Sequence, residues 1–211
     1  TYIAGKHLLS VRDMNLSHRI GDLLDAGVTS FKIEGRLKDT NYIKNVVAYY
    51  RRAVDEALAV RPGFVRSSAG ESVPDFTPDP SKSFTRGESE YFFAGKRPGV
   101  ASFDTPKAIG EYVGRVAKVF GNGFTLLGEA ELAPGDGICF ITPHGVTGTN
   151  VNAAEGRRIV PNRMEGIVVG AEVYRNSDRL FNLRLERSRT RRVIPATAVA
   201  EVSAEGFAMT Y

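Results

Sequence analysis

The feature that most constrains the fold is a change of pattern near residue 109, where a stretch rich in Ser, Pro, Gly and Asp gives way to short alternating apolar runs divided by turns. Residues 112–119 alternate, Gly121-Asn122-Gly123 offers a tight turn, and residues 124–127 alternate again. Closely spaced strands of this kind are typical of a small antiparallel β-barrel. We assign this barrel to residues 107–178, with further strands expected at 138–141, 163–168 and 172–174.

Residues 1–60 show a different pattern, which predicts a helix, a strand and a second helix. Apolar residues at helical spacing within 20–24 indicate the first helix, with Ser10 or Asp13 as the candidate cap and Gly27 at its end. The strand is expected at 29–34. An α-β-α unit of this kind is typical of the closing part of a (β/α)8 barrel.

The second helix is followed by a long connection. Its apolar residues repeat at three and four between 43 and 58, Asp39 or Thr40 can cap it, and Pro62-Gly63 ends it. Residues 61–106 are rich in Ser, Pro, Gly and Asp, which predicts an extended linker across a surface or between domains.

The predicted strand at 29–34 ends in a charged turn. Lys32 and Glu34 point to one side of the strand, and Arg36 follows Gly35. Ligand sites of parallel α/β sheets are built at the C-terminal strand ends. We therefore take Lys32, Glu34 and Arg36 as candidate catalytic residues. Lys32 or Arg36 would bind a carboxylate or phosphate group, and Glu34 would orient that group or act as a general base. The alternative is a set of surface charges after a strand.

Nearby polar residues complete this candidate site. We take Lys38, Ser10 and Asp13 as candidate substrate-binding residues. Neither a Gly-x-Ser-x-Gly elbow nor a His-Glu-x-x-His motif is present, so these residues do not independently support peptide hydrolysis.

Arginines gather after residue 178. The formal net charge is only +4, so this basicity is local. Grouped arginines near a β-barrel can bind an RNA backbone, although an ordinary solvated face has the same pattern. Residues 179–211 alternate like further strands, which either complete the barrel or begin another β-domain. The candidate RNA-binding residues are Arg184, Arg187, Arg189, Arg191 and Arg192.

Several classes of protein are disfavoured by composition. No apolar run is long enough to cross a bilayer, and no signal peptide opens the chain, so we expect no membrane partner and a cytoplasmic location. Cys139 is the single cysteine, which rules out an internal disulfide and any multi-cysteine metal or iron–sulfur site within this chain. We expect no metal ligands here.

Two separated motifs carry a family resemblance. Lys32-Ile33-Glu34-Gly35-Arg36-Leu37-Lys38, with the Tyr-rich stretch 41–51 after it, is similar to collagenase-like peptidase family U-32. Phe84-Thr85-Arg86-Gly87 resembles the segment that these proteins carry after their catalytic barrel. The similarity is greatest to members that resemble RNA hydroxylation proteins. Separately, Gly114-Arg115-Val116 with Pro134-Gly135-Asp136 looks like the second-domain barrel of elongation factors, a likeness of fold alone.

The resemblance implies an α+β chain that begins with the α-β-α end of a (β/α)8 barrel and continues through the linker into the small β-barrel. It also implies that this chain is the C-terminal portion of a longer protein. The N-terminal barrel of that protein, which would hold an iron–sulfur cluster, lies outside this sequence. The whole protein would hydroxylate bases of ribosomal or transfer RNA, and this portion alone would be inactive. Collagenase-like proteolysis and a non-catalytic RNA-binding module are the alternatives.

Overall fold

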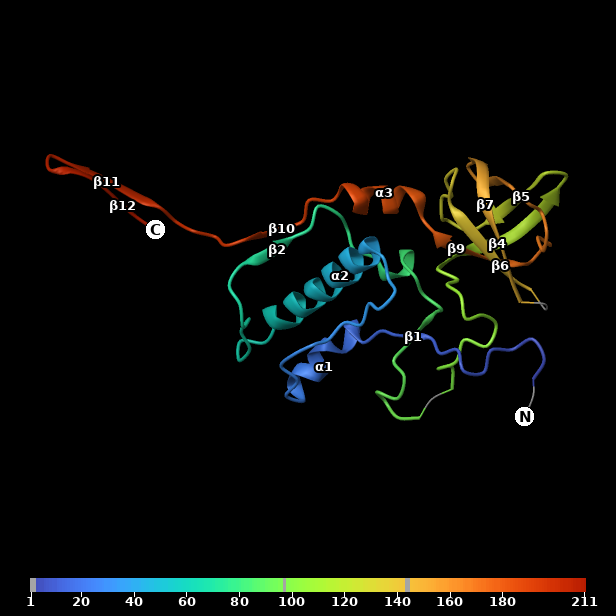
Figure 1. The fold of residues 1–211 in the computed structure, drawn as a ribbon, viewed down its shortest axis with the longest axis horizontal. Coiled ribbons are helices and arrows are strands. Elements are labelled where there is room, and N and C mark those ends of the chain that lie inside the picture. Colours follow the sequence, from blue (N-terminus) through green and yellow to red (C-terminus); the bar gives the residue numbers. More distant parts are fainter. Residues whose placement is uncertain (1–2, 97, 143–144) are drawn as a thin grey trace.

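The computed structural model describes residues 3–96, 98–142 and 145–211. Figure 1 shows a β-barrel at one end, a helical unit in the middle, and a hairpin that extends away at the other end. The protein therefore mixes α and β elements, as the sequence predicts. Within the described ranges, no helix combines the length and apolarity needed to cross a bilayer.

Six antiparallel strands close a barrel, which confirms the small antiparallel β-barrel. Their order around the barrel is β4-β5-β8-β7-β6-β9. The strands are β4 (Glu111–Phe120), β5 (Gly123–Leu127), β6 (Gly137–Thr142), β7 (Gly145–Glu155), β8 (Arg158–Pro161) and β9 (Glu172–Ser177).

Every barrel strand contributes buried apolar side chains to one core. In its interior, the rings of Phe124 and Phe140 meet edge to face with centroids 5.9 Å apart. Gly114 allows β4 and β5 to approach closely, because its φ is +140° and a Cβ there would clash with the Leu127 carbonyl oxygen. A register shift beside it, between Tyr112 and Gly114, bends β4 as a barrel requires.

One predicted barrel strand is wrong. Residues 163–168 form an irregular loop with a turn at 165–166, and the chain returns to the barrel only at β9. Pro161 ends β8, and Gly166 adopts a φ of +76°, which a continuous strand does not contain. The apolar residue Ile167 is buried in the barrel core without being part of a strand.

The helical unit contains a 3-10 turn, η1 (Ser17–Arg19), which leads into α1 (Ile20–Asp25), and the long helix α2 (Thr40–Ala59). Gly27 ends α1 as predicted: its φ is +89°, and the Val28 N–H donates to the Leu23 carbonyl oxygen. The Asp39 carboxylate caps α2 by accepting a 2.7 Å hydrogen bond from the Tyr42 N–H.

Two details of the predicted α-β-α unit are wrong. Neither Ser10 nor Asp13 caps the first helix, since the Asn15 side-chain oxygen accepts from the Ser17 N–H at the start of η1 and no described side chain caps α1. Residues 28–35 form no strand. A parallel strand exists only beside hydrogen-bonding neighbours, and no described strand pairs with 29–34. Among the described residues, the structure thus shows the two helices of the unit with no strand between them.

The connection after α2 is extended but tied to other segments. It contains β2 (Glu71–Val73), η2 (Pro80–Lys82) and β3 (Glu88–Ser89). β3 pairs in parallel with β1 (Asp13–Met14), and β2 pairs antiparallel with β10 (Arg191–Val193). These short ladders hold the connection against both the N-terminal and the C-terminal part of the chain.

The prediction of strands throughout 179–211 is wrong at its start, where residues 179–187 form helix α3 (Arg179–Arg187). The Asp178 carboxylate caps α3 by accepting from the Phe181 N–H at 2.9 Å. Phe181 and Leu185, one helical turn apart, bury themselves against Phe76. Only after α3 do strands β10, β11 (Val199–Ser203) and β12 (Gly206–Thr210) follow, and none of them joins the barrel, which closes without them.

A buried charge network joins the barrel to α3 and to η2. Arg175 of β9 is 8% exposed and donates to Glu111 at 2.6 Å and to the Glu131 carbonyl oxygen at 3.1 Å. Its guanidinium also lies 3.5 Å from Asp136 and 3.4 Å from Asp178. Lys82 adds a second cation, 2.7 Å from Asp178 and 3.5 Å from Glu111. Charged groups this far from water persist because each has partners.

Candidate functional site

The three candidate catalytic side chains lie on an exposed loop. Lys32 and Glu34 form a 2.8 Å ion pair, and their side chains are 84% and 70% exposed. The hydrogen bond to Glu34 and the negative charge of that carboxylate raise the pKa of Lys32. Arg36 is exposed and contacts no described residue through a hydrogen bond or ion pair. The loop brings Lys32 and Glu34 together, but it does not enclose a reaction site with them.

The backbone turns sharply between this loop and α2. The Lys38 N–H donates to the Gly35 carbonyl oxygen at 3.0 Å, and Leu37 adopts a φ of +61°. A positive φ is uncommon for a branched side chain and costs of the order of 1–3 kcal/mol. Leu37 gains no burial in exchange, since it is 97% exposed. The turn positions Lys38 immediately before the Asp39 cap.

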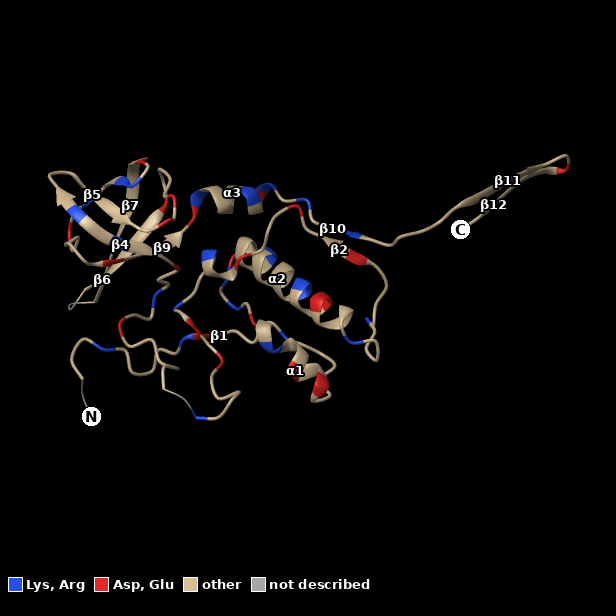
Figure 2. Cartoon of the chain, turned by 180° about the vertical axis from the view of Figure 1, so that it is seen from behind, with Lys and Arg blue, Asp and Glu red and all other residues tan. Residues whose placement is uncertain are grey.

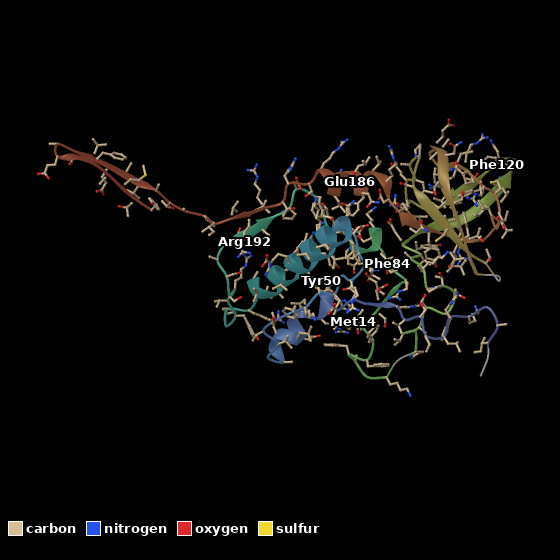
Figure 3. The ribbon with its side chains drawn as sticks, viewed as in Figure 1. Met14, Tyr50, Phe84, Phe120, Glu186 and Arg192 are labelled. Atoms are coloured by element: carbon tan, nitrogen blue, oxygen red, sulfur yellow. The ribbon has the colours of Figure 1, made fainter. Side chains whose placement is uncertain are left out.

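Lys38 points back onto aromatic rings. Its ammonium lies 3.1 Å from the centroid of the Phe84 ring and 5.6 Å from that of Tyr42. Loss of hydration lowers the pKa of Lys38. Figure 3 shows Phe84 between helix α2 and the β-barrel. The end of the first family motif and the start of the second motif therefore meet in space.

Asp13 and Arg86 form the other side of this cluster. The Asp13 carboxylate accepts from the Arg86 guanidinium at 3.0 Å and from the Arg86 backbone N–H at 2.9 Å. The hydrogen bond to Asp13 and the charge of its carboxylate raise the pKa of Arg86, whose guanidinium lies 5.8 Å from the centroid of the Phe84 ring. Of the predicted substrate-binding residues, Lys38 and Asp13 thus share one cluster.

Ser10 has a structural role in the same region. It is buried, and its hydroxyl donates to the Thr105 carbonyl oxygen at 3.1 Å. It also lines a hollow of about 520 Å3 together with Lys6, His7 and Arg86. Ser10 therefore anchors the N-terminal segment to residues near 105, at the edge of the Asp13–Arg86 pair.

The candidate RNA-binding arginines all lie exposed on α3 and the chain that follows it. Figure 2 shows these basic residues along α3 and toward β10. Arg192 is engaged, because its guanidinium donates to the Ser68 hydroxyl at 2.9 Å. The backbone N–H of Arg189 donates to Asp75 at 2.8 Å, which fixes the chain and leaves the guanidinium unused. No described residue pairs with the guanidinium groups of Arg184, Arg187, Arg189 and Arg191.

Phe84 and Arg86 belong to the site, although the sequence pattern selects them only as part of a motif and not as candidate site residues. Their signal is present in the sequence, because both belong to the Phe84-Thr85-Arg86-Gly87 motif of the linker. Tyr42 is predicted from sequence only as a residue of the second helix. Among the residues described, no group of three or more His, Cys, Asp and Glu side chains is placed to hold a metal ion.

Comparison with known proteins identifies relatives of this chain. Residues 2–101 match the model of Peptidase family U32. The chain is 39% identical over 164 residues to the 23S rRNA 5-hydroxycytidine C2501 synthase of Escherichia coli (strain K12), covering 75% of this chain and 25% of that relative. It is 24% identical over 144 residues to tRNA hydroxylation protein P of the same organism, covering 67% of this chain and 30% of the relative.

A third relative has a different name. The chain is 27% identical over 194 residues to a collagenase of Porphyromonas gingivalis (strain ATCC BAA-308 / W83), covering 85% of this chain and 44% of the relative. The chain thus spans less than half the length of each of these three proteins. No solved structure gives a significant match. Over residues 2–101, the chain belongs to peptidase family U32.

Proposed function

We propose that this chain is part of a cytoplasmic RNA hydroxylation protein that acts on ribosomal or transfer RNA. The observation that carries the proposal is the 39% identity over 164 residues with the rRNA synthase. That alignment is longer than the U32 segment of residues 2–101, so it continues into other parts of the chain. A relative with tRNA hydroxylation in its name points to the same chemistry.

The arginines of α3 and β10 support a contact with RNA. Without partners among the described residues, the guanidinium groups of Arg184, Arg187, Arg189 and Arg191 can neutralise phosphates, and Arg192 holds the underlying chain to residues 68–69. Guanidinium groups bind phosphate oxygens with two donors at once, which gives both affinity and orientation. This surface would position RNA without reading its sequence.

The exposed loop with Lys32, Glu34 and Arg36 supplies the catalytic edge in this proposal. Beside it lies an apolar groove of about 330 Å3 between the loop and α2, which Phe31, Ile33 and Val47 help to line. Ile33 and Val47 are 38% and 46% exposed. We propose that the protein's own N-terminal barrel covers this groove, and that residues 29–34 then pair as a strand of a (β/α)8 barrel, with residues 1–60 as its C-terminal end.

The iron–sulfur cluster expected for the whole protein would be held outside this chain. Cys139 is the single cysteine of the sequence, and it is buried within β6 with its thiol 3.5 Å from the Ile109 carbonyl oxygen. Burial raises the pKa of this thiol to about 12, which disfavours the thiolate that a metal site needs. The residues of this chain therefore do not fit a cluster. Their proposed roles are to bind RNA and to present Glu34.

Proteolysis is the second candidate function, because a relative named collagenase aligns with 85% of the chain. A non-catalytic RNA-binding module is the third, and it predicts RNA binding that is independent of Glu34. These functions make different demands on the same residues. Peptide cleavage needs no arginine surface, whereas RNA hydroxylation needs both the surface and the loop.

Nucleoside mass spectrometry tests the proposal. Ribosomal and transfer RNA are isolated from cells that lack the gene and from cells restored with wild type, Glu34→Ala or the exposed control Glu205→Ala. The proposal predicts a hydroxylated nucleoside that is absent in the deletion strain and returns with wild type and Glu205→Ala but not with Glu34→Ala. Full recovery with Glu34→Ala would remove that residue from the site, and an unchanged nucleoside profile in the deletion strain would refute RNA hydroxylation.

A further inference from the structure

A groove of about 260 Å3 lies where three distant segments meet, namely residues 37–42, 82–84 and 176–182. These segments come from the family motif and the start of α2, from the second motif, and from the end of β9 with the start of α3. Its volume is close to the lower end of ligand pockets, about 300 Å3, so it suits one small unit and not an extended polymer.

The Lys38 ammonium is an unused donor in this groove. It has three N–H bonds, yet no described acceptor takes a hydrogen bond from it and no described carboxylate lies within ion-pair distance. Its neighbours are the rings of Phe84 and Tyr42. Lys82 also lines the groove, but its ammonium is committed to Asp178 at 2.7 Å. Among the described residues that line the groove, the free positive charge is therefore that of Lys38.

Three amide side chains surround the same space. Asn41 donates to the Asn182 carbonyl oxygen at 3.3 Å, and the Asn182 amide nitrogen reaches the Ser177 hydroxyl at 3.5 Å. The side-chain oxygens of both residues have no donor among the described residues, and the Asn176 amide forms no hydrogen bond with any of them. Amides offer donors and acceptors side by side, which is the pattern that nucleobase edges require.

We propose that this groove binds one nucleotide of single-stranded RNA, with a phosphate on the Lys38 ammonium and the base edge against the amides of Asn41, Asn176 and Asn182. This inference rests on the proposed function and assigns a subsite to it. Aromatic rings, a cation and convergent amides are the groups by which proteins hold splayed, unpaired nucleotides. The groove also begins one residue after Arg36, so the chain leads directly from the exposed loop of Lys32 and Glu34 into the groove.

The test measures RNA binding and its location. Fluorescence anisotropy gives the affinity of the 211-residue chain for a short single-stranded RNA containing 4-thiouridine, and light-induced crosslinking followed by peptide mass spectrometry gives the contact. Lys38→Gln removes the charge and retains most of the side-chain length, and Asn41→Ala removes one amide. Lys118→Gln is the matched control, because Lys118 is an exposed lysine on the barrel whose ammonium forms no hydrogen bond or ion pair with a described residue. Circular dichroism verifies that each variant is folded.

We expect Lys38→Gln to weaken RNA binding about tenfold, the effect of one charge-assisted hydrogen bond, and Lys118→Gln to change it less than about twofold. Crosslinks should fall within residues 37–42 or 176–182, and a mononucleotide should compete better than inorganic phosphate. If Lys38→Gln and Asn41→Ala both bind RNA as tightly as wild type, the nucleotide subsite is refuted and the proposed function still stands. The same conclusion follows if inorganic phosphate competes as well as a mononucleotide. A wild-type chain that binds no RNA refutes the subsite together with the RNA contact.

Discussion

Replacing Arg175 by methionine should destabilise the protein strongly. In the folded state, its guanidinium is 8% exposed and lies within 3.5 Å of carboxylates from Glu111, Asp136 and Asp178. Methionine fills similar space but leaves these three carboxylates with Lys82 as their remaining cation among the described residues. Breaking a buried ion pair by removing one partner costs about 3–5 kcal/mol, because the other charge stays buried and uncompensated.

Urea unfolding followed by circular dichroism measures this cost. The matched control is Arg115→Met on the same barrel, since Arg115 pairs with Glu172 at 2.7 Å while their side chains are 53% and 37% exposed. An exposed pair of this kind contributes about 0–1 kcal/mol, so the control should stay close to wild type. If Arg175→Met lost no more unfolding free energy than Arg115→Met, the network would not be what joins the barrel to α3.

Three further predictions concern the barrel and its junction. Gly114→Ala should prevent the close approach to Leu127 and lower the melting temperature, whereas Gly121→Ala, which has open space around it, should not; equal melting temperatures would contradict this. Cys139, with its pKa raised to about 12 by burial, should resist iodoacetamide at pH 8 until urea unfolds the chain, and rapid labelling of the folded protein would show that the thiol is accessible. Burial acts to raise the pKa of Asp178, but hydrogen bonds and nearby cations outweigh it and lower that pKa. Asp178 therefore stabilises the fold above the unfolded carboxyl pKa of about 3.9, and this stability is lost as the pH falls through the folded pKa, so Asp178→Asn should flatten the acid-side decline in unfolding free energy.

The barrel could be predicted because its signals are local. The alternation in 112–119 and the turn at Gly121-Asn122-Gly123 specify a hairpin by themselves, and the structure forms β4 and β5 there. The same reasoning was wrong at 179–187, because Leu183 and Leu185 fit a strand as well as a helix. The spacing of Phe181 and Leu185 and the cap from Asp178 favour the helix over the strand. These two features become informative only once Phe76 is known to lie against Phe181 and Leu185.

The strand expected at 29–34 fails for a different reason. Its residues have the composition of a strand, but a parallel strand depends on neighbours, and none is formed by the described residues. The candidate site was likewise predictable only in part. The sequence selects Lys38 and Asp13 as candidate substrate-binding residues, but their meeting at Phe84 and Arg86 joins positions more than 40 residues apart, which no local pattern reveals.

The salt dependence of RNA affinity shows whether the exposed arginines of α3 and the chain that follows it bind RNA. The dissociation constant for single-stranded RNA is measured over a range of salt concentrations for wild type, for Glu34→Ala, and for a variant with Arg184, Arg187, Arg189 and Arg191 changed to Gln. Each phosphate that is no longer neutralised should reduce the slope of log affinity against log salt by about 0.7, so the slope of the arginine variant should fall by up to about 3 while Glu34→Ala keeps the wild-type slope. If the arginine variant instead binds with the wild-type affinity and slope, these arginines do not contact RNA.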